Sequence, residues 1–427
     1  MIYVLRASWA LLLGMFFLQI GNGLQGSLIG VRGTIEGFSV FEMSLMGSAY
    51  FLGFLGGSTL APKFIARVGH VRVFAALASL ISAAVICYPI IADPWAWMGL
   101  RVVIGFSFSG VYVTAESWLN NAATNETRGQ SLSTYMLVQM LGLVAAQNIL
   151  SAGDPSGWIL FVIPSILVSL SFTPILLTVQ PTPASEATRP MTLANLYKAS
   201  PFSVVAMLFL GSVFAGQFAM ASVYATQQGL ALAELSAFVS SFFIGAIVLQ
   251  YPIGWLSDRM DRRILIVAAS GLGGAIAIGG ILFGHSYVTL FIVGTLSGGT
   301  AQPLYALIIA YTNDYLDPDD MAAAASGLVF VNGIGAIFGP PAMSMLMTQF
   351  GPAGFWVFLA VVMAFIAGYG LWRITQRASA YAEEDQYEAV SYAPLLPGAA
   401  SPVAVETAQE LYVEAAEELA ETSETQP

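Results

Sequence analysis

The sequence predicts an all-α integral membrane protein: twelve transmembrane helices arranged in two pseudo-symmetric six-helix halves. Three observations support this fold class. Hydrophobic residues make up 57% of the 427 residues and charged residues only 9%, whereas soluble domains are about 45–50% apolar. The charges that do occur are separated by long uncharged runs, and the basic residues gather in alternate loops. We therefore expect most of the chain to be solvated by lipid.

The uncharged runs give the helices in chain order, because a helix needs roughly 20 apolar residues to cross a bilayer core. The runs of single-helix length are 7–31, 43–62, 73–92, 129–153, 155–185, 199–233 and 235–257, together with 94–115, which only Arg101 interrupts. Two longer runs, 264–313 and 321–372, each hold two helices, with breaks near His285–Ser286 and at Gly351–Pro352. The total is twelve. No segment has the alternating pattern of about ten residues that is typical of membrane strands.

The formal net charge of −11 comes from the C-terminal tail. Residues 378–427 contain eleven acidic residues and no basic one, which leaves 14 acidic and 14 basic residues in 1–377. This composition predicts an acidic, disordered cytoplasmic tail over 377–427. Several glutamates in it fall at helical spacing, so a helix that forms on a partner is the alternative.

The positions of lysine and arginine predict the orientation. With twelve helices, one side of the membrane carries both termini and twelve basic residues, whereas the other side carries only Arg32. Short cytoplasmic loops are enriched in basic residues. We therefore expect a multi-pass protein of a bacterial cytoplasmic (inner) membrane, with both termini in the cytoplasm.

The chain also repeats itself at a nearly constant offset of 192 or 193 residues. The matching pairs include Gln25 and Gln217, Gly53 and Gly245, Arg67 and Arg259, Gly105 and Gly298, and Tyr112 and Tyr305. The pairs follow one another in chain order, which predicts two equivalent halves over 1–180 and 201–376, joined by a cytoplasmic linker over 181–200. Two parallel repeats around a central site are typical of alternating-access transporters.

Two motifs carry a resemblance to a known family. GWLSDRMDRR, residues 254–263, resembles the cytoplasmic signature of the major facilitator superfamily between helices 8 and 9, and RVVIGFSFSG, residues 101–110, resembles its helix-4 signature. The segment VTAESWLNN, residues 113–121, is similar to the YcaD-like bacterial branch. The resemblance covers residues 1–376. It implies a transporter whose helices 1, 4, 7 and 10 line a central cavity.

Arg101 is the only charge well inside a predicted span. An arginine at that depth costs at least ~2.5–3.5 kcal/mol, so its side chain must face protein or water. One interpretation is a contact with an anionic substrate or a role in proton coupling, and the resemblance implies the latter. The other is a brace for helix 4, satisfied by neighbouring carbonyl groups.

The uncharged polar residues of the cavity-lining helices are the remaining candidates for substrate binding. They are Gln19, Asn22 and Gln25 in helix 1, Tyr112 in helix 4, Gln217, Tyr224 and Gln227 in helix 7, and Gln302 and Tyr305 in helix 10. Amides and phenols suit hydroxyl groups, amides or a carboxylate that one arginine balances. The alternative is hydrogen bonding between helices, worth about 0.6 kcal/mol per contact in membranes.

The charged residues at the cytoplasmic side form a predicted gate. Its members are Gly254, Asp258, Arg259, Asp261, Arg262 and Arg263, together with Arg67, Glu116 and Arg128. We expect Asp258 to pair with Arg262 at i,i+4 spacing, or to stabilise a nearby helix N-terminus, and Gly254 to permit close packing. In the first half, Ala66 stands opposite Asp258 and Gly69 opposite Asp261. The two halves therefore differ in their acidic residues.

Glu116 has two interpretations. It lies fifteen residues after Arg101, roughly 22 Å along a helix, so the two cannot pair directly. The favoured interpretation is an ion pair with Arg67, Arg72 or Arg128 that locks the inner ends of the helices. The sharper alternative is a carboxylate that titrates during proton coupling.

These observations predict a secondary active transporter that moves a small solute by alternating access, with proton coupling as the favoured mechanism. We expect a monomer that contacts the solute, protons and the lipid bilayer, and that is not an enzyme. The sequence has no phosphate-binding loop and no Cys/His cluster, so we expect no cofactor, metal or nucleic acid. One alternative is an efflux antiporter for amphipathic drugs. Another is a non-transporting sensor or scaffold that acts through the acidic tail.

Overall fold

A computed structural model describes residues 2–122, 125–177, 192–257, 259–316 and 318–376, and within these ranges the chain is helical and has no strands. The helices before the linker are α1 (Ile2–Ile35), α2 (Val40–Val68), α3 (His70–Cys87), α4 (Pro94–Ala122), α5 (Asn125–Ala152), α6 (Ile159–Ser171) and α7 (Thr173–Leu177). The later helices are α8 (Leu193–Ala199), α9 (Pro201–Gln227), α10 (Leu232–Ser257), α11 (Arg262–Phe283), α12 (Tyr287–Asn313), α13 (Pro318–Phe350), the 3₁₀ turn η1 (Gly351–Ala353) and α14 (Gly354–Ile374). The acidic tail and most of the linker lie outside the described residues.

The twelve predicted spans are confirmed as helices. Eleven stretches of the described residues are long and apolar enough to cross a membrane, and the last of them, Ala323–Ile374, contains both α13 and α14. These two helices are separated at Gly351, whose φ of +62° lies in the left-handed region that glycine adopts readily. The other predicted break is also present, since α11 ends at Phe283 and α12 begins at Tyr287.

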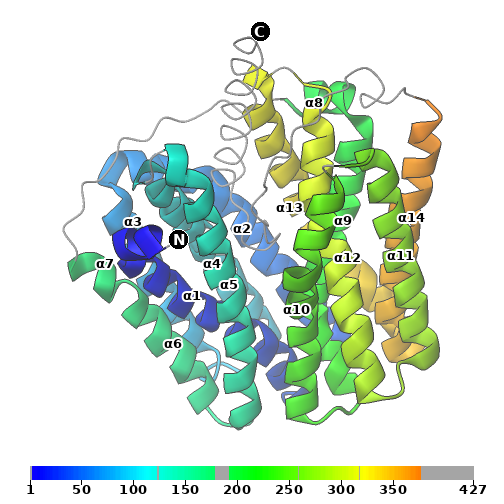
Figure 1. Ribbon diagram of the computed structural model, residues 1–427. Coiled ribbons are helices and arrows are strands. Elements are labelled where there is room, and N and C mark those ends of the chain that lie inside the picture. Colours follow the sequence, from blue (N-terminus) through cyan, green and yellow to red (C-terminus); the bar gives the residue numbers. More distant parts are fainter. Residues whose placement is uncertain (1, 123–124, 178–191, 258, 317, 377–427) are drawn as a thin grey trace.

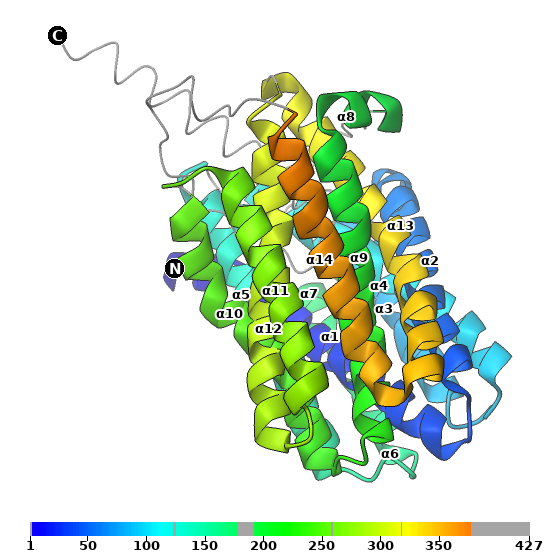
Figure 2. The same cartoon turned by 90° about the vertical axis from the view of Figure 1, so that its right-hand side faces the viewer.

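The helices form an elongated bundle with two ends (Figure 1). We call the end that carries α8 and the α2–α3 and α10–α11 turns the linker end, and the opposite end, with the α1–α2 and α11–α12 turns, the far end. Helices α1–α7 lie together on one side of the bundle and α9–α14 on the other. The view turned by 90° shows α8 at the same end as the start of α9 (Figure 2).

Helices α2 and α4 cross at very short distance because each presents a glycine to the backbone of the other. Gly53 of α2 lies against the carbonyl group of Val102, and Gly105 of α4 lies against the carbonyl group of Tyr50. A Cβ atom at either glycine would overlap that backbone. The crossing therefore requires glycine at both positions.

Helices α10 and α12 repeat this crossing residue for residue. Gly245 lies against the carbonyl group of Thr295, and Gly298 lies against that of Phe242. All four positions are displaced by 192 or 193 residues from their counterparts in α2 and α4. The offset found in the sequence thus connects two equal helix crossings.

The contacts between the two groups of helices lie toward the far end. The Phe218 ring of α9 packs over Gly26 of α1, and Gly47 of α2 lies against Ala219. The Ser48 hydroxyl donates a hydrogen bond of 2.6 Å to the carbonyl oxygen of Ile337 in α13. In Figure 1 the two groups approach each other at the far end and diverge toward the linker end.

Candidate functional site

Arg101 lies inside the first group of helices and is 2% exposed. Its Nη1 donates a hydrogen bond of 2.7 Å to Gln25 Oε1 of α1, and its Nε donates one of 3.3 Å to the carbonyl oxygen of Met46 in α2. The guanidinium carbon lies 4.5 Å from the centroid of the Tyr50 ring, a cation–π distance. Among the residues with described side chains, no carboxylate pairs with Arg101. Its positive charge is met by neutral groups alone.

A continuous chain of hydrogen bonds extends from Arg101 across α1, α4 and α5. Gln25 donates to Asn22 Oδ1 at 3.2 Å, and Asn22 donates to the Tyr112 hydroxyl at 2.9 Å. Tyr112 donates to Gln19 Oε1 at 2.5 Å, and Gln19 donates to Gln139 Oε1 at 2.8 Å. The structure therefore brings together all the first-half substrate-binding candidates. We call this set, with Arg101 and Tyr50, the Arg101 network.

The structure adds two members to this network that the sequence did not single out. Gln139 ends the chain from α5, and Tyr50 of α2 donates to Asn22 Oδ1 at 3.4 Å while its ring faces Arg101. Gln139 is one of three glutamines in the uncharged run 129–153, and an amide inside such a run was a usable signal. Tyr50 had no such signal, because an aromatic residue in an apolar run is ordinarily part of the core.

The second-half candidates on α9 and α12 have partly unsatisfied polar groups. Gln217 Nε2 donates to Ser297 Oγ at 3.2 Å. Gln217 Oε1, Gln302 Oε1 and the Tyr305 hydroxyl are buried without a hydrogen-bond partner among the described residues. Unmade hydrogen bonds at buried groups cost roughly 1–3 kcal/mol each. These three groups are therefore unsatisfied in this conformation.

Two other candidates on α9 do not join this set. The Tyr224 hydroxyl accepts hydrogen bonds from Trp356 Nε1 at 2.9 Å and from Gln228 Nε2 at 3.2 Å, and its ring stacks on Phe355 at 4.9 Å. Gln227 is exposed at the far end of α9. In this conformation Tyr224 therefore belongs to an aromatic cluster with α14, apart from the unsatisfied groups of Gln217, Gln302 and Tyr305.

Glu116 is buried on α4, at 2% exposure, and its carboxylate accepts a hydrogen bond of 3.2 Å from the Tyr135 hydroxyl of α5. It also lies within electrostatic range of Tyr305 on α12. Arg67 and Arg72 are exposed, and among the described residues neither forms an ion pair with Glu116. The side chain of Arg128, the third predicted partner, lies outside the described residues.

The charged turn between α10 and α11 is anchored differently from the prediction. Arg262 forms an ion pair with Asp314, just beyond α12, and the two side chains are 4% and 8% exposed. Arg263 pairs with Asp261 at 2.7 Å, and Asp261 caps α11 by accepting a hydrogen bond of 2.9 Å from the Arg263 backbone N–H. The pair that joins two helices is thus Arg262–Asp314. The sequence pointed to Asp258 instead, because Asp258 lies among arginines whereas Asp314 lies at the edge of an uncharged run, with other aspartates after it.

Three other members of the predicted gate have separate positions. Arg259 is stacked on Trp255, 4.2 Å from the ring centroid, and donates to the Trp255 carbonyl oxygen at 3.1 Å. Gly254 is exposed with no atom within 4 Å of an added Cβ, so the predicted close packing there is wrong in this conformation. Asp258 lies outside the described residues.

The first half has a histidine where the second half has Arg262. At the offset of 192, His70 corresponds to Arg262, and each residue is the first of its helix, α3 and α11. His70 Nε2 lies 3.0 Å from Ser117 Oγ of α4, whereas Arg262 binds a carboxylate. The linker ends of the two halves therefore differ, as their sequences indicated.

The Arg262–Asp314 pair predicts a pH-dependent stability. Burial raises the pKa of Asp314 to about 6, although the nearby Arg262 guanidinium lowers it. A carboxyl group whose folded pKa lies above its unfolded value stabilises the protein fully below about pH 4 and loses this contribution as the pH rises through about 6. The full change amounts to roughly 3 kcal/mol. Thermal unfolding in detergent between pH 4.5 and 7.5 should show this slope in the native protein, and Asp314→Asn should flatten it.

The control for this measurement is Asp320→Asn, which removes an exposed carboxylate near the same end and reports on net charge alone. It should retain the native slope. An equal slope in the Asp314→Asn variant would assign the pH dependence to other groups.

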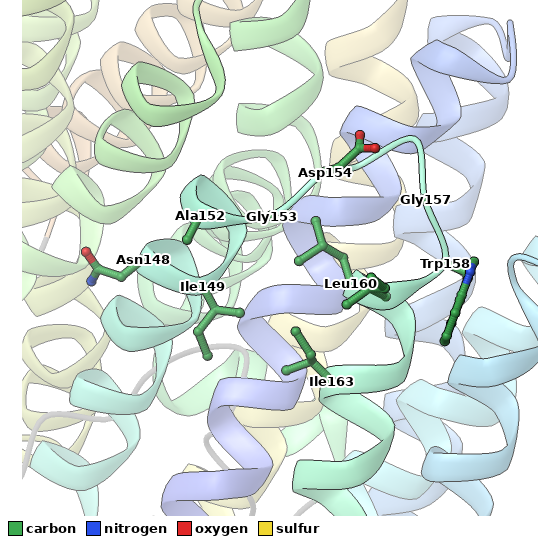
Figure 3. Close-up of a pocket in the computed structure, with 10 residues that line it drawn as sticks. Asn148, Ile149, Ala152, Gly153, Asp154, Gly157, Trp158, Leu160 and Ile163 are labelled. Carbon is green, nitrogen blue, oxygen red and sulfur yellow. The ribbon is translucent and has the colours of Figure 1, made fainter.

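A separate cavity of about 610 Å³ lies at the far end, between the end of α5 and the start of α6 (Figure 3). Ile149, Leu160 and Ile163 contribute apolar side chains to it, and Asp154 lies on the loop at its rim. Arg32 fixes this loop: it donates to the carbonyl oxygens of residues 155–157 and also pairs with Glu36 at 2.6 Å. The lining shares no residue with the Arg101 network.

The apolar helices and the buried polar network together define a multi-pass membrane transporter. Comparison with known families agrees: the profile of the Major Facilitator Superfamily matches residues 11–238 and again 202–405. The chain belongs to this superfamily.

Curated relatives assign it to the YcaD-like branch. An uncharacterized MFS-type transporter from Yersinia pestis (strain Pestoides F) is 25% identical over 359 residues, covering 82% of this chain and 92% of the relative. The uncharacterized MFS-type transporter YcaD from Escherichia fergusonii is 24% identical over 365 residues, with 84% and 93% covered.

Solved structures share the fold. A variant of the nucleoside transporter NupG aligns with a TM-score of 0.75 at 13% identity, covering 86% of this chain and 100% of that one. A variant of the E. coli fucose:proton symporter FucP aligns with a TM-score of 0.54 at 16% identity, with 85% and 98% covered. At these identities the likeness concerns the fold alone.

Proposed function

We propose that the protein is a secondary active transporter of a small polar solute that works by alternating access between two six-helix halves, 1–180 and 201–376. The observation that carries the proposal is the fully buried Arg101 network, which lies beside helices that contact the second half. A charge and six polar side chains are expensive inside a membrane protein and mark a substrate or ion pathway.

The repeated glycine crossings support the two-halves arrangement. Each crossing locks two helices of one group together through backbone contact, Gly53 and Gly105 in one case and Gly245 and Gly298 in the other. Rigid groups with a contact that is concentrated at one end suit a rocking motion. The positive-inside pattern makes the linker end cytoplasmic, so this conformation is closed toward the outside.

The chemistry of the solute follows from the groups that lack partners. Gln217, Gln302 and Tyr305 offer amide and phenol groups from the second half, and none of them is charged. Such groups bind hydroxyls and amides. The solved neighbours include a nucleoside transporter and a fucose symporter, and these solutes also carry hydroxyl groups.

Proton coupling is part of the proposal. Glu116 is a buried carboxylate that is hydrogen-bonded to Tyr135 of its own half and lies within electrostatic range of Tyr305 of the other. A carboxylate placed between two moving groups can change its proton affinity as the groups separate. A solute-driven pH change inside vesicles that Glu116→Gln removes would support the coupling.

Deleting residues 378–427 tests the transporter against the scaffold alternative. The helices that carry the Arg101 network and both glycine crossings all end before the tail, so we expect the truncated protein to retain its transport rate within about twofold. A thermal-shift screen of metabolites against the purified protein first identifies a solute, and its flux is then measured in proteoliposomes. A truncated protein that folds but transports nothing would favour an activity that resides in the tail.

A further inference from the structure

Three side chains, Arg101, Tyr50 and Phe218, form a row of contacts that joins the two groups of helices. Arg101 of α4 lies 4.5 Å from the centroid of the Tyr50 ring of α2. The Phe218 ring of α9 lies 5.8 Å from the same Tyr50 ring, with 35° between the planes, and 6.3 Å from the neighbouring Phe51 ring. Tyr50 thus contacts the buried charge of one half and an aromatic side chain of the other.

The surrounding backbone leaves little room for this arrangement to relax. Phe218 packs over Gly26 of α1, and one turn further along both helices Ser222 and Val223 pack against Gly30. Val223 is fully buried, as is Tyr50, whose hydroxyl is hydrogen-bonded to Asn22. The α1–α9 contact is therefore closed along two successive turns. Phe218 contributes the aromatic side chain at the first of these turns.

We propose that Phe218 is the plug of the gate at the far end, and that Tyr50 is a positioning residue that couples this plug to Arg101. The inference rests on the proposed transport function and specifies how its site is linked to one gate. When Arg101 holds the Tyr50 ring, the ring offers a fixed surface for Phe218 and the far end stays closed. When a solute or a changed hydrogen bond draws Arg101 away, the Tyr50 ring loses its cation–π contact. Phe218 then loses the fixed surface on which it packs, and the far end opens.

The coupling follows from the geometry of the cation–π contact. A guanidinium stacked on a buried aromatic ring contributes about 2 kcal/mol, and an aromatic pair contributes about 0.5–1.5 kcal/mol. Both contacts share the single Tyr50 ring, so they cannot change independently. An event at Arg101 is thereby transmitted through Tyr50 to the contact between the halves.

Cysteine labelling measures the opening of this gate directly and needs no known solute. The chain has one cysteine, Cys87. In a Cys87→Ser background, Val223→Cys places a thiol of similar size in the closed contact, where a membrane-impermeant maleimide added to intact cells reaches it only when the far end opens. We expect Phe218→Ala and Tyr50→Leu to raise the labelling rate about tenfold, equivalent to about 1.4 kcal/mol, and Arg101→Gln to raise it roughly fivefold.

Two conservative variants and one control accompany these measurements. Tyr50→Phe retains the ring and should label at the native rate, and Arg101→Lys should label between the native protein and Arg101→Gln. Phe209→Ala removes an aromatic side chain of the same helix whose ring packs on Phe365 of α14 at 4.5 Å. It should leave the rate unchanged.

Two results would overturn the proposal. Native labelling in a folded Phe218→Ala protein would show that Phe218 does not close the far end. Native labelling in both Tyr50→Leu and Arg101→Gln, with faster labelling in Phe218→Ala, would show a plug without coupling. These failures are distinct from failure of the proposed function, which would appear as absent solute flux in vesicles whatever the labelling rates.

Discussion

Replacing Arg101 by glutamine should lower the initial rate of solute transport by at least roughly 100-fold, while the protein still inserts and remains monodisperse in detergent. The substitution removes a charged hydrogen bond to Gln25, a second one to the Met46 carbonyl oxygen and the cation–π contact with Tyr50. Charged hydrogen bonds contribute about 1.5–3 kcal/mol and a desolvated cation–π contact about 2 kcal/mol. Losing them disorders the network from which the solute site is built.

The comparison with lysine separates the charge from the shape of the guanidinium. Arg101→Lys retains a positive charge but cannot stack its planar group on Tyr50 while donating to Gln25. We expect it to transport at an intermediate rate. Arg373→Gln is the matched control, because Arg373 also lies over an aromatic ring, Trp372 at 5.7 Å, but at the end of α14. It should transport within about twofold of the native rate.

Flux is measured in proteoliposomes with the solute that the thermal-shift screen identifies. Native transport by Arg101→Gln would remove Arg101 from the mechanism and leave it as a brace for α4. Native transport by Arg101→Lys, with none by Arg101→Gln, would assign its role to charge alone.

The first-half site was predictable from the sequence because its members carry a strong signal. A charge or an amide in an uncharged run of about 20 residues must find a partner inside the protein. Arg101, Gln25, Asn22 and Gln19 are such residues, and the structure joins them into one chain of hydrogen bonds. Spacing along α1 placed its three amides on one face.

The aromatic and interhelical contacts were not predictable in the same way. Phe218 and Tyr50 belong to helices that are apolar on nearly all sides, so periodicity does not say which face meets a partner. Tyr224 shows the same limit, because the bond between its hydroxyl and Trp356 of α14 depends on how the two helices pack. The rotation of a helix about its own axis is set by its packing against other helices, which cannot be read from the sequence of that helix alone.

Asp314 was overlooked for a different physical reason. An acidic residue at the border of an uncharged run is ordinarily a solvated loop residue, whereas Asp261 and Asp258 sit among arginines. Pairing with Arg262 across α11 and α12 depends on where two helices end in space. The same argument explains why His70 gave no signal: its equivalence to Arg262 becomes meaningful only when both residues are seen to begin a helix.

The glycine crossings lead to the second prediction with a large effect. Gly245→Leu should prevent the accumulation of folded protein, and Gly245→Ala should lower the free energy of unfolding by about 1–3 kcal/mol. An added Cβ meets the backbone carbonyl of Thr295, which cannot rotate away as a flexible side chain can. Helices α10 and α12 would have to separate along their whole contact. Thermal unfolding in detergent, followed by fluorescence-detected size exclusion, measures both variants.

Gly279→Ala is the matched control, since Gly279 of α11 has no atom within 4 Å of an added Cβ. Alanine in a helix interior is favoured over glycine by about 0.5–1 kcal/mol, so this variant should be slightly more stable than the native protein. Gly53→Ala should repeat the loss seen for Gly245→Ala, because the carbonyl group of Val102 occupies the equivalent place. Tolerance of alanine at Gly53 but not at Gly245 would mean that the two crossings do not hold their halves with equal rigidity. The rocking motion would then require a different pivot, since it depends on each half moving as one body.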